Sequence, residues 1–234
     1  ASAAARVCVD HDWDDGPRDH AKRMTRKELA PLHYEALRVA GYNRAQIKAS
    51  NVIGVFVGIE ANDCKDILCA SPAGTGVYAA TGHSLTVASG RLSFVLGLQG
   101  PCSTINTACS SGLVALQGAH DATAGGDAAS GALACGVNVV LEPTISINFA
   151  VKGITSPRGR CWTFDASADG YLRSEAAGCF AVAPVDDALD ASGFSEDAYC
   201  ATSLGVSVRH DGKSASLTAP NGSAQPCTPE AAPL

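Results

Sequence analysis

The sequence predicts an α/β protein with a mostly parallel, buried sheet. Two stretches, 51–59 and 132–141, are nearly continuous runs of apolar and small residues, as expected of strands that are covered on both faces. Helical patterns separate such runs along the chain, and this alternation is typical of a layered α/β fold. Only 6% of the residues are aromatic while glycine occurs 24 times, and small residues permit close contact between helices and a sheet.

The expected elements follow in a regular order. Residues 1–23 are expected to be irregular and polar, with Gly16-Pro17 as a breaker. The elements after them are a helix over 31–40, a strand over 51–59, a helix over 77–96 ended by Gly97, a strand over 102–108, a helix over 110–123, a strand over 132–141, a helix over 143–153, a turn-rich stretch over 156–171, and strands over 178–184 and 198–208. The helix over 110–123 is expected to turn Leu113, Leu116 and Ala119 inward. Residues 24–225 then form the folded region, and 226–234 form a frayed tail.

Composition and charge exclude several classes of function. The net charge is −6, the isoelectric point is near 5.4, and no run of Lys or Arg is present, so no nucleic-acid partner is expected. No apolar run approaches the ~20 residues that cross a bilayer, so no membrane span is expected. A targeting sequence is not visible, and the chain begins at Ala1 rather than Met.

The ten cysteines lack the regular spacing of a disulfide framework. Cys135, Cys179 and Cys200 lie within apolar runs and are expected to be small buried residues. Cys64 and Cys69 have no CxxC spacing and no paired histidines follow them, so no metal site is expected. A reducing compartment, cytoplasmic or plastid, fits this usage best.

Residues 100–116, GPCSTINTACSSGLVAL, are the most informative segment of the chain. They predict a strand, then Cys109, then small residues and a helix with an apolar face. Such an elbow presents a nucleophile at a helix N-terminus, where unpaired N–H groups and the helix dipole favour a thiolate and can hold an oxyanion. The alternative is that Cys109 is one more small buried residue.

This segment resembles the active site of β-ketoacyl synthases, especially those of modular polyketide synthases, through Thr107-Ala108-Cys109-Ser110-Ser111. Other segments match that family in the expected order between about residues 30 and 225. They are YEAL with AG at 34–41, GVFVG at 54–58, SGRLS at 89–93, GVN at 136–138, SPRGRC at 156–161, FDASADGY at 164–171, DGKS at 211–214 and LTAPNG at 217–222. Residues 24–225 are thereby identified as the N-terminal region of a ketosynthase, incomplete in this chain.

The resemblance implies a thiolase-like layered fold and an acyltransferase activity in polyketide or fatty-acid biosynthesis. Cys109 would accept an acyl chain from the phosphopantetheine thioester of an acyl carrier protein or domain. A malonyl-type extender would then lose CO₂ and attack the acyl-cysteine in a Claisen condensation. The resemblance implies no metal and no directly bound cofactor, and it implies a homodimer for full-length members.

Two histidines that the family uses with the cysteine lie in HGTGT-like and NIGH-like motifs, and neither motif occurs before Leu234. None of the six histidines, His120 and His210 included, is expected to be catalytic. The chain alone is therefore expected to be inactive in condensation. The alternative is a truncated, non-catalytic paralogue that acts as a structural or partner-binding subunit. A cysteine protease is disfavoured, because no CGSCW-like segment or suitable histidine follows.

Smaller departures from the family's pattern are Ser174 in place of a glycine, Trp162 in place of a basic residue and Asn106 in place of an aspartate. These are expected to alter the shape of the pocket or the interface without removing the chemistry.

Overall fold

The computed structural model describes residues 3–8, 34, 36–38, 42–43, 45, 47, 52–60, 62–77, 79–82, 84–124, 129–184, 201–203, 205–216 and 219–224. Its centre is a six-stranded sheet with the strand order β3-β2-β4-β5-β1-β6. The strands are β1 (Ala3–Cys8), β2 (Ile53–Ile59), β3 (Cys102–Ile105), β4 (Gly131–Asn138), β5 (Ala176–Pro184) and β6 (Ala201–Ser203). The α/β class expected from the sequence is confirmed.

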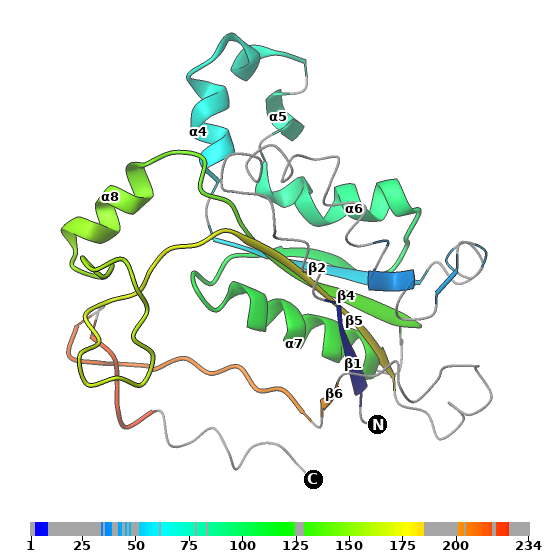
Figure 1. Ribbon diagram of the computed structural model, residues 1–234. Coiled ribbons are helices and arrows are strands. Elements are labelled where there is room, and N and C mark those ends of the chain that lie inside the picture. The colour runs from blue at the N-terminus through cyan, green and yellow to red at the C-terminus, as the bar shows by residue number, and fades with distance from the viewer. Residues whose placement is uncertain are drawn as a thin grey trace.

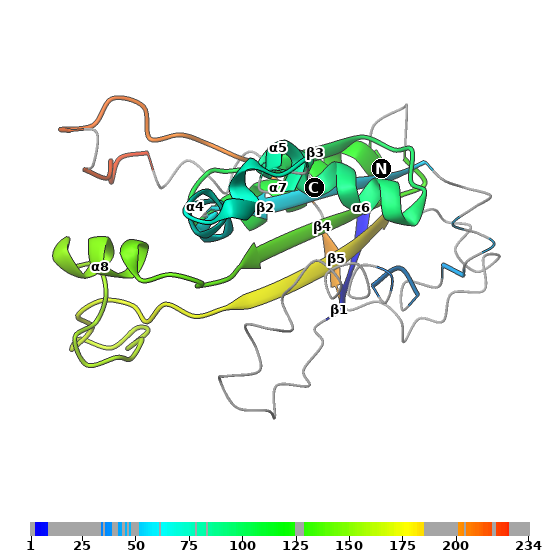
Figure 2. The same ribbon diagram turned by 90° about the horizontal axis from the view of Figure 1, so that it is seen from above.

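The sheet is mixed rather than mostly parallel. Strand β2 runs parallel to both β3 and β4, but β4 with β5, β5 with β1 and β1 with β6 are antiparallel pairs. Figure 2 shows why β5 reverses: α8 (Thr144–Val151) and the loop after it lie beyond the carboxyl end of β4. The chain therefore re-enters the sheet from the end where β4 left it, and β5 must run the opposite way.

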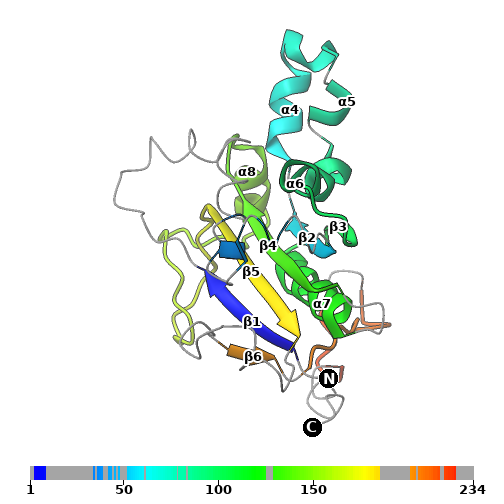
Figure 3. The same ribbon diagram turned by 90° about the vertical axis from the view of Figure 1, so that its right-hand side faces the viewer.

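The expectation of an irregular segment over 1–23 is wrong at its start. Strand β1 pairs with β5 along six residues, from Ala3 opposite Pro184 to Cys8 opposite Cys179, and Figure 3 shows the two strands running in opposite directions. This pairing is made with a strand that is distant in the sequence, and local patterns do not reveal such a partner. The remaining residues of that segment and the tail over 226–234 lie outside the described part of the chain.

Two helices cover the two faces of the sheet, α6 (Ala88–Leu96) on one and α7 (Ser111–Ala124) on the other (Figure 1). Alternate residues of β2 point to opposite faces, as the pleat requires. Val55 packs in a cluster that includes Leu92 of α6, whereas Phe56 packs with Ala115 and Ala119 of α7. The strand is thus buried on both faces, as the sequence predicted.

The single helix expected over 77–96 is broken into α5 (Ala79–Gly82), a short 3₁₀ helix η2 (Leu85–Val87) and α6. Ser84 interrupts it because its backbone is extended, and its hydroxyl bonds the Thr86 hydroxyl at 2.5 Å. Gly97 ends α6 in the left-handed conformation with φ of 72°, as predicted.

Of the strand expected over 198–208, the described residues 201–203 form β6, and 205–208 are not in a strand. Two further helical elements, α4 (Asp63–Cys69) and a short 3₁₀ helix η1 (Pro72–Thr75), follow β2.

Of the three residues that the sequence predicted to face inward on helix α7, Ala119 is buried and Leu116 packs partly, but Leu113 is not buried. Its buried residues are Ser111, Ala115, Ala119 and Thr123, while Leu113 is 71% exposed. These residues follow one another at intervals of four, so they form one stripe along the helix. Because the stripe is made of small residues, the helix axis lies close to the sheet. Leu116 does pack partly against this cluster.

Candidate active site

Cys109 is exposed in the bend that connects β3 to α7. Strand β3 ends at Ile105, three residues earlier than expected, and α7 begins at Ser111. The thiol therefore precedes the first turn of a fourteen-residue helix, as the sequence predicted. Its exposure is inconsistent with the alternative that Cys109 is a small buried residue.

Asn106 shortens the strand by taking over its backbone hydrogen bonds. Its side-chain amide donates to the Glu60 carbonyl oxygen at 3.0 Å, and its Oδ1 accepts from the Ala108 N–H at 3.1 Å. The second contact closes a local turn that competes with the strand ladder. Asn106 therefore anchors the bend to the end of β2.

Ser111 and Ser110 lock the bend from the helix side. The Ser111 hydroxyl accepts from the Thr107 N–H at 2.9 Å and donates to the Ala108 carbonyl at 2.6 Å. The Ser110 hydroxyl donates to the Thr107 carbonyl at 2.7 Å. Ala108 has φ of 55°, which a residue with a Cβ adopts at a cost of about 1 kcal/mol or more. The bonds on both sides of Ala108 hold this strained residue, and thereby fix the position of Cys109.

Glycines let the first turn of α7 approach the sheet unusually closely. A Cβ on Gly58 of β2 would lie 2.5 Å from the Ser111 carbonyl carbon and oxygen. Across the same contact, a Cβ on Gly112 would have the Gly136 Cα at 4.0 Å as its nearest neighbour. The helix start thus rests on the β2 backbone itself, which sets the height of Cys109 above the sheet.

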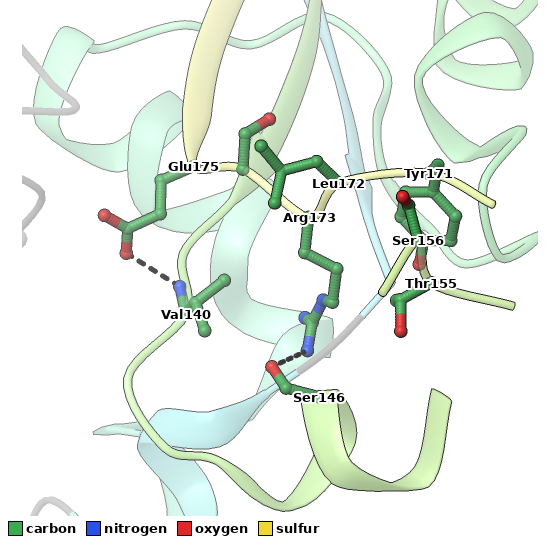
Figure 4. Close-up of a pocket in the computed structure, with 9 residues that line it drawn as sticks. Val140, Ser146, Thr155, Ser156, Tyr171, Leu172, Arg173 and Glu175 are labelled. Carbon is green, nitrogen blue, oxygen red and sulfur yellow. Dashed lines mark hydrogen bonds between the residues drawn. The ribbon is translucent and has the colours of Figure 1, made fainter. Parts of the chain in front are cut away.

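A cavity of about 480 Å³ opens beyond the ends of β4 and β5. Figure 4 shows its lining, which comes from three segments of the chain. The lining residues are Val140, Ser146, Thr155, Ser156, Tyr171, Leu172, Arg173, Ser174 and Glu175. Four of the nine carry aliphatic hydroxyl groups, so the wall is more polar than that of a typical small-molecule pocket.

Tyr171 connects this cavity electrostatically to Cys109. Burial raises the pKa of the Tyr171 hydroxyl above its ordinary value of 10.0, the nearby Arg173 guanidinium opposes the rise, and Glu60 and the Cys109 thiol add to it. The hydroxyl is therefore protonated at neutral pH and can donate a hydrogen bond. The cavity and Cys109 also lie at one edge of the sheet, because β3 and β4 both run parallel to β2 and end there.

Sequence reasoning placed Tyr171 in a recognisable motif but identified neither Tyr171 nor Arg173 as a site residue. The signal that could have identified them is the run of polar residues that continues from FDASADGY at 164–171 into LRSE at 172–175. The cavity also depends on Ser146 of α8 and on Thr155, which pairs with Tyr171 across an isolated bridge. These residues come together only in the tertiary structure, so no single segment of the sequence indicates that they share a cavity.

Neither described histidine is arranged for catalysis with Cys109. His120 lies eleven positions along α7, roughly 16 Å from Cys109 at the rise of an α-helix. Its Nδ1 is 3.5 Å from the Asp121 carboxylate, and its Nε2 is buried without a partner. His210 accepts from the Gly212 N–H at 2.9 Å and so stabilises a turn. The other four histidines lie outside the described residues.

Cys135 and Cys179 are buried, as expected, and face each other across β4 and β5 with their sulfur atoms 3.3 Å apart. Burial and this contact raise the pKa of the Cys135 thiol. Cys200 is outside the described part of the chain. Among the described residues, no group of three or more His, Cys, Asp or Glu could hold a metal ion, and no helix there is long and apolar enough to cross a membrane.

Comparison with known proteins places this site in a family. Residues 3–188 match the beta-ketoacyl synthase, N-terminal domain. The highly reducing polyketide synthase dmxL2 of Cryptosporiopsis sp. is 38% identical over 211 residues, which are 89% of this chain and 8% of that protein. The spectinabilin polyketide synthase system protein NorC of Streptomyces orinoci is 39% identical over 84% of this chain and 8% of its own length.

Solved structures agree with the sequence matches. The oxazolomycin ketosynthase domain OzmH KS7 of Streptomyces albus JA3453 superposes with a TM-score of 0.73 at 30% identity, over 84% of this chain and 34% of that chain. The ketosynthase from module 6 of the bacillaene synthase of Bacillus subtilis 168 gives a TM-score of 0.68 at 30% identity, over 84% and 32%. The expected thiolase-like fold is confirmed, and this chain spans about a third of these ketosynthase chains.

Proposed function

Since this chain belongs to the β-ketoacyl synthase family, we propose that it is the nucleophile-bearing part of a polyketide-type ketosynthase and that Cys109 accepts the acyl chain. The observation that carries the proposal is the exposed thiol at a hydrogen-bonded strand-to-helix bend. The polyketide assignment, rather than a fatty-acid one, rests on the names of the similar proteins. The donor is the phosphopantetheine thioester of an acyl carrier protein or domain, which is a substrate arm and not a bound cofactor.

The acyl-transfer step requires few groups other than those of this bend. The Cys109 thiolate attacks the thioester carbonyl, and a helix start such as that of α7 offers N–H groups for the oxyanion that forms. Collapse of the tetrahedral intermediate breaks the original C–S bond. The acyl group is then a thioester of Cys109, and the carrier thiolate leaves and takes up a proton.

Condensation requires further groups that act on the extender. In that step the extender loses CO₂, its enolate attacks the acyl-Cys109 carbonyl, and the Cys109 thiolate leaves. The enolate needs hydrogen-bonding groups, which the family draws from two histidine motifs that this sequence does not contain. We therefore propose acyl transfer for this chain, and condensation only where segments that carry the two histidine motifs are also present. The homodimer that the family resemblance implies for full-length members stays a separate proposal.

A non-catalytic, partner-binding role is the second candidate. It is favoured by large apolar side chains that are exposed near the site, among them Leu113 of α7 and Val151 of α8, which is 83% exposed. The two roles differ in whether Cys109 carries acyl groups. A cytoplasmic or plastid location stays a prediction.

The test is incubation of the chain with a radiolabelled hexanoyl carrier protein and a malonyl carrier protein. We expect label on the wild-type chain, none on Cys109→Ala, normal labelling of the matched Cys102→Ala control, and no β-ketoacyl product. Equal labelling of wild type and Cys109→Ala would contradict acyl transfer to Cys109. Labelling that is absent from both would favour the partner-binding role.

A further inference from the structure

Arg173 stands in the cavity wall as a cation without a carboxylate partner among the described residues. Its Nη1 donates to the Ser146 hydroxyl at 2.9 Å, and its guanidinium carbon lies 5.4 Å from the centre of the Phe149 ring. Glu175, the acidic residue of the same wall, instead accepts from the Val140 N–H at 2.8 Å. Figure 4 shows the two side chains pointing in different directions.

The guanidinium retains donors after these contacts. A guanidinium carries five N–H groups, and the bond to Ser146 uses one. The Phe149 ring covers one face of the Arg173 guanidinium. The contacts with Phe149 and Ser146 therefore orient the guanidinium and leave N–H groups on its edge available to a ligand in the cavity. A ligand that covers these donors has to offer them an acceptor, because donors that lose their hydrogen-bond partners are costly.

The rest of the wall presents hydroxyl groups to the same space. Thr155 and Ser156 lie on one side of Arg173 and Ser146 on the other (Figure 4). The apolar contribution is limited to Val140, Leu172 and the ring of Tyr171. A saturated alkyl chain in this cavity would displace water from Arg173 without replacing its hydrogen bonds.

The cavity is placed to receive what Cys109 carries. Cys109 follows the carboxyl end of β3, the cavity opens beyond the carboxyl end of β4, and these strands are both parallel to β2, so thiol and cavity share one edge of the sheet. The volume of about 480 Å³ accommodates a short acyl chain. Charge and hydroxyl groups therefore lie at the sheet edge where an acyl group on Cys109 would be carried.

We propose that Arg173, oriented by Ser146 and Phe149, selects acyl chains that bear a hydroxyl or carbonyl oxygen over saturated chains of the same length. The inference rests on the proposed function, because it concerns the acyl group that Cys109 accepts. The chain oxygen accepts a hydrogen bond from the guanidinium, and a chain without that oxygen leaves the cation unpaired. Sites of this kind reject the analogue that lacks the polar group more strongly than apolar pockets reject an added hydroxyl.

The experiment is a competition on the full 234-residue chain. Equal concentrations of the N-acetylcysteamine thioesters of 3-hydroxyhexanoate and hexanoate are offered together, and the two masses on the Cys109 peptide are compared. We expect the hydroxylated adduct to form about ten times faster, in line with one hydrogen bond to a charged group. The preference should vanish in Arg173→Met, persist in part in Arg173→Lys, and remain unchanged in Arg160→Met, which removes a charge stacked on Trp162 outside the cavity.

The ratio of the two adducts separates selection from a merely structural role, because misfolding lowers both rates together. If Arg173→Met does not fold, Ser146→Ala supplies the second variant, and it should reduce the preference by releasing the guanidinium. A wild-type ratio near one, or an unchanged ratio in the variants, would overturn the inference while acylated Cys109 still supported the proposed function. Failure of both thioesters to acylate Cys109 would overturn both.

Discussion

Replacing Gly58 by alanine should displace the start of α7 and with it Cys109. The new Cβ would lie 2.5 Å from the Ser111 backbone, whereas ordinary contacts begin near 3.4 Å. Because the atoms in the way are backbone rather than a flexible side chain, the helix start must move by roughly 1 Å. Overpacking of this kind typically costs about 1–3 kcal/mol of unfolding free energy. A shift of about 1 Å at a reacting group can slow its chemistry about a hundredfold.

The matched control is Gly112→Ala, on the other side of the same contact. There the new Cβ meets nothing closer than the Gly136 Cα at 4.0 Å, and alanine raises helix stability by up to about 1 kcal/mol over glycine. Urea unfolding and the rate of acylation of Cys109 are measured for both variants. The two alanines should change stability in opposite directions, and only Gly58→Ala should slow acylation. Wild-type stability and wild-type acylation in Gly58→Ala would refute the close-contact argument.

Three further changes test other parts of the site. Limiting iodoacetamide near neutral pH should label Cys109 first and leave Cys135 unlabelled, because burial raises the pKa of Cys135. Peptide mapping that finds Cys109 unlabelled would be incompatible with the exposed bend. Asn106→Ala should cost about 1 kcal/mol in urea unfolding and slow the labelling of Cys109, because two bonds that anchor the bend are lost, and equal labelling rates would count against that anchor. Hydrogen bonds from Arg158 and Ser156 lower the pKa of Asp169 below its ordinary value of 3.8. The Asp169 carboxylate therefore stabilises the folded state above pH 3.8, and this stabilisation is lost as the pH falls through the lowered pKa. Asp169→Asn should therefore melt lower than wild type at pH 7 and equal to it in strong acid, and a gap in melting temperature that persists in acid would contradict this assignment.

The sequence predicted the nucleophile bend well because the bend is made by neighbours in the chain. Asn106, Thr107, Ser110 and Ser111 bond to groups within five residues, apart from the contact of Asn106 with Glu60. Gly97 was predictable for the same reason, since a left-handed helix end strongly favours glycine. Local chemistry of this kind can be read directly from residue order.

Pairings between distant segments could not be read in this way. Strand β1 joins the sheet only through partners about 170 to 200 residues away, and its composition gives little indication of a strand. Ala119 was predicted correctly, but the burial of Leu113 was mispredicted. Leu113 is strongly apolar, yet the close approach of the helix to β2 favours small side chains on the buried stripe. Packing distance, not hydropathy, decided which face was buried.

The cavity also could not be predicted from the sequence. Its wall joins Ser146, Thr155 and Tyr171, which become neighbours only after α8 and the following loop fold back beyond the strand ends. The motif around Tyr171 marked the region as important without indicating that it forms a cavity. Side-chain direction in a loop is set by tertiary contacts, and single-sequence patterns carry no information about it.

The central claim is that Cys109 is an acyl acceptor, and the most direct measurement is the site of acylation itself. The chain is incubated with a hexanoyl thioester, digested at low pH so that thioesters survive, and mapped by tandem mass spectrometry over all ten cysteines. The account predicts a hexanoyl group on Cys109 that hydroxylamine removes, with at most trace acylation of Cys64, Cys69, Cys102 and Cys161, although these thiols are also exposed. Acyl groups spread evenly over the exposed cysteines, or absent from Cys109 in a folded chain, would contradict it.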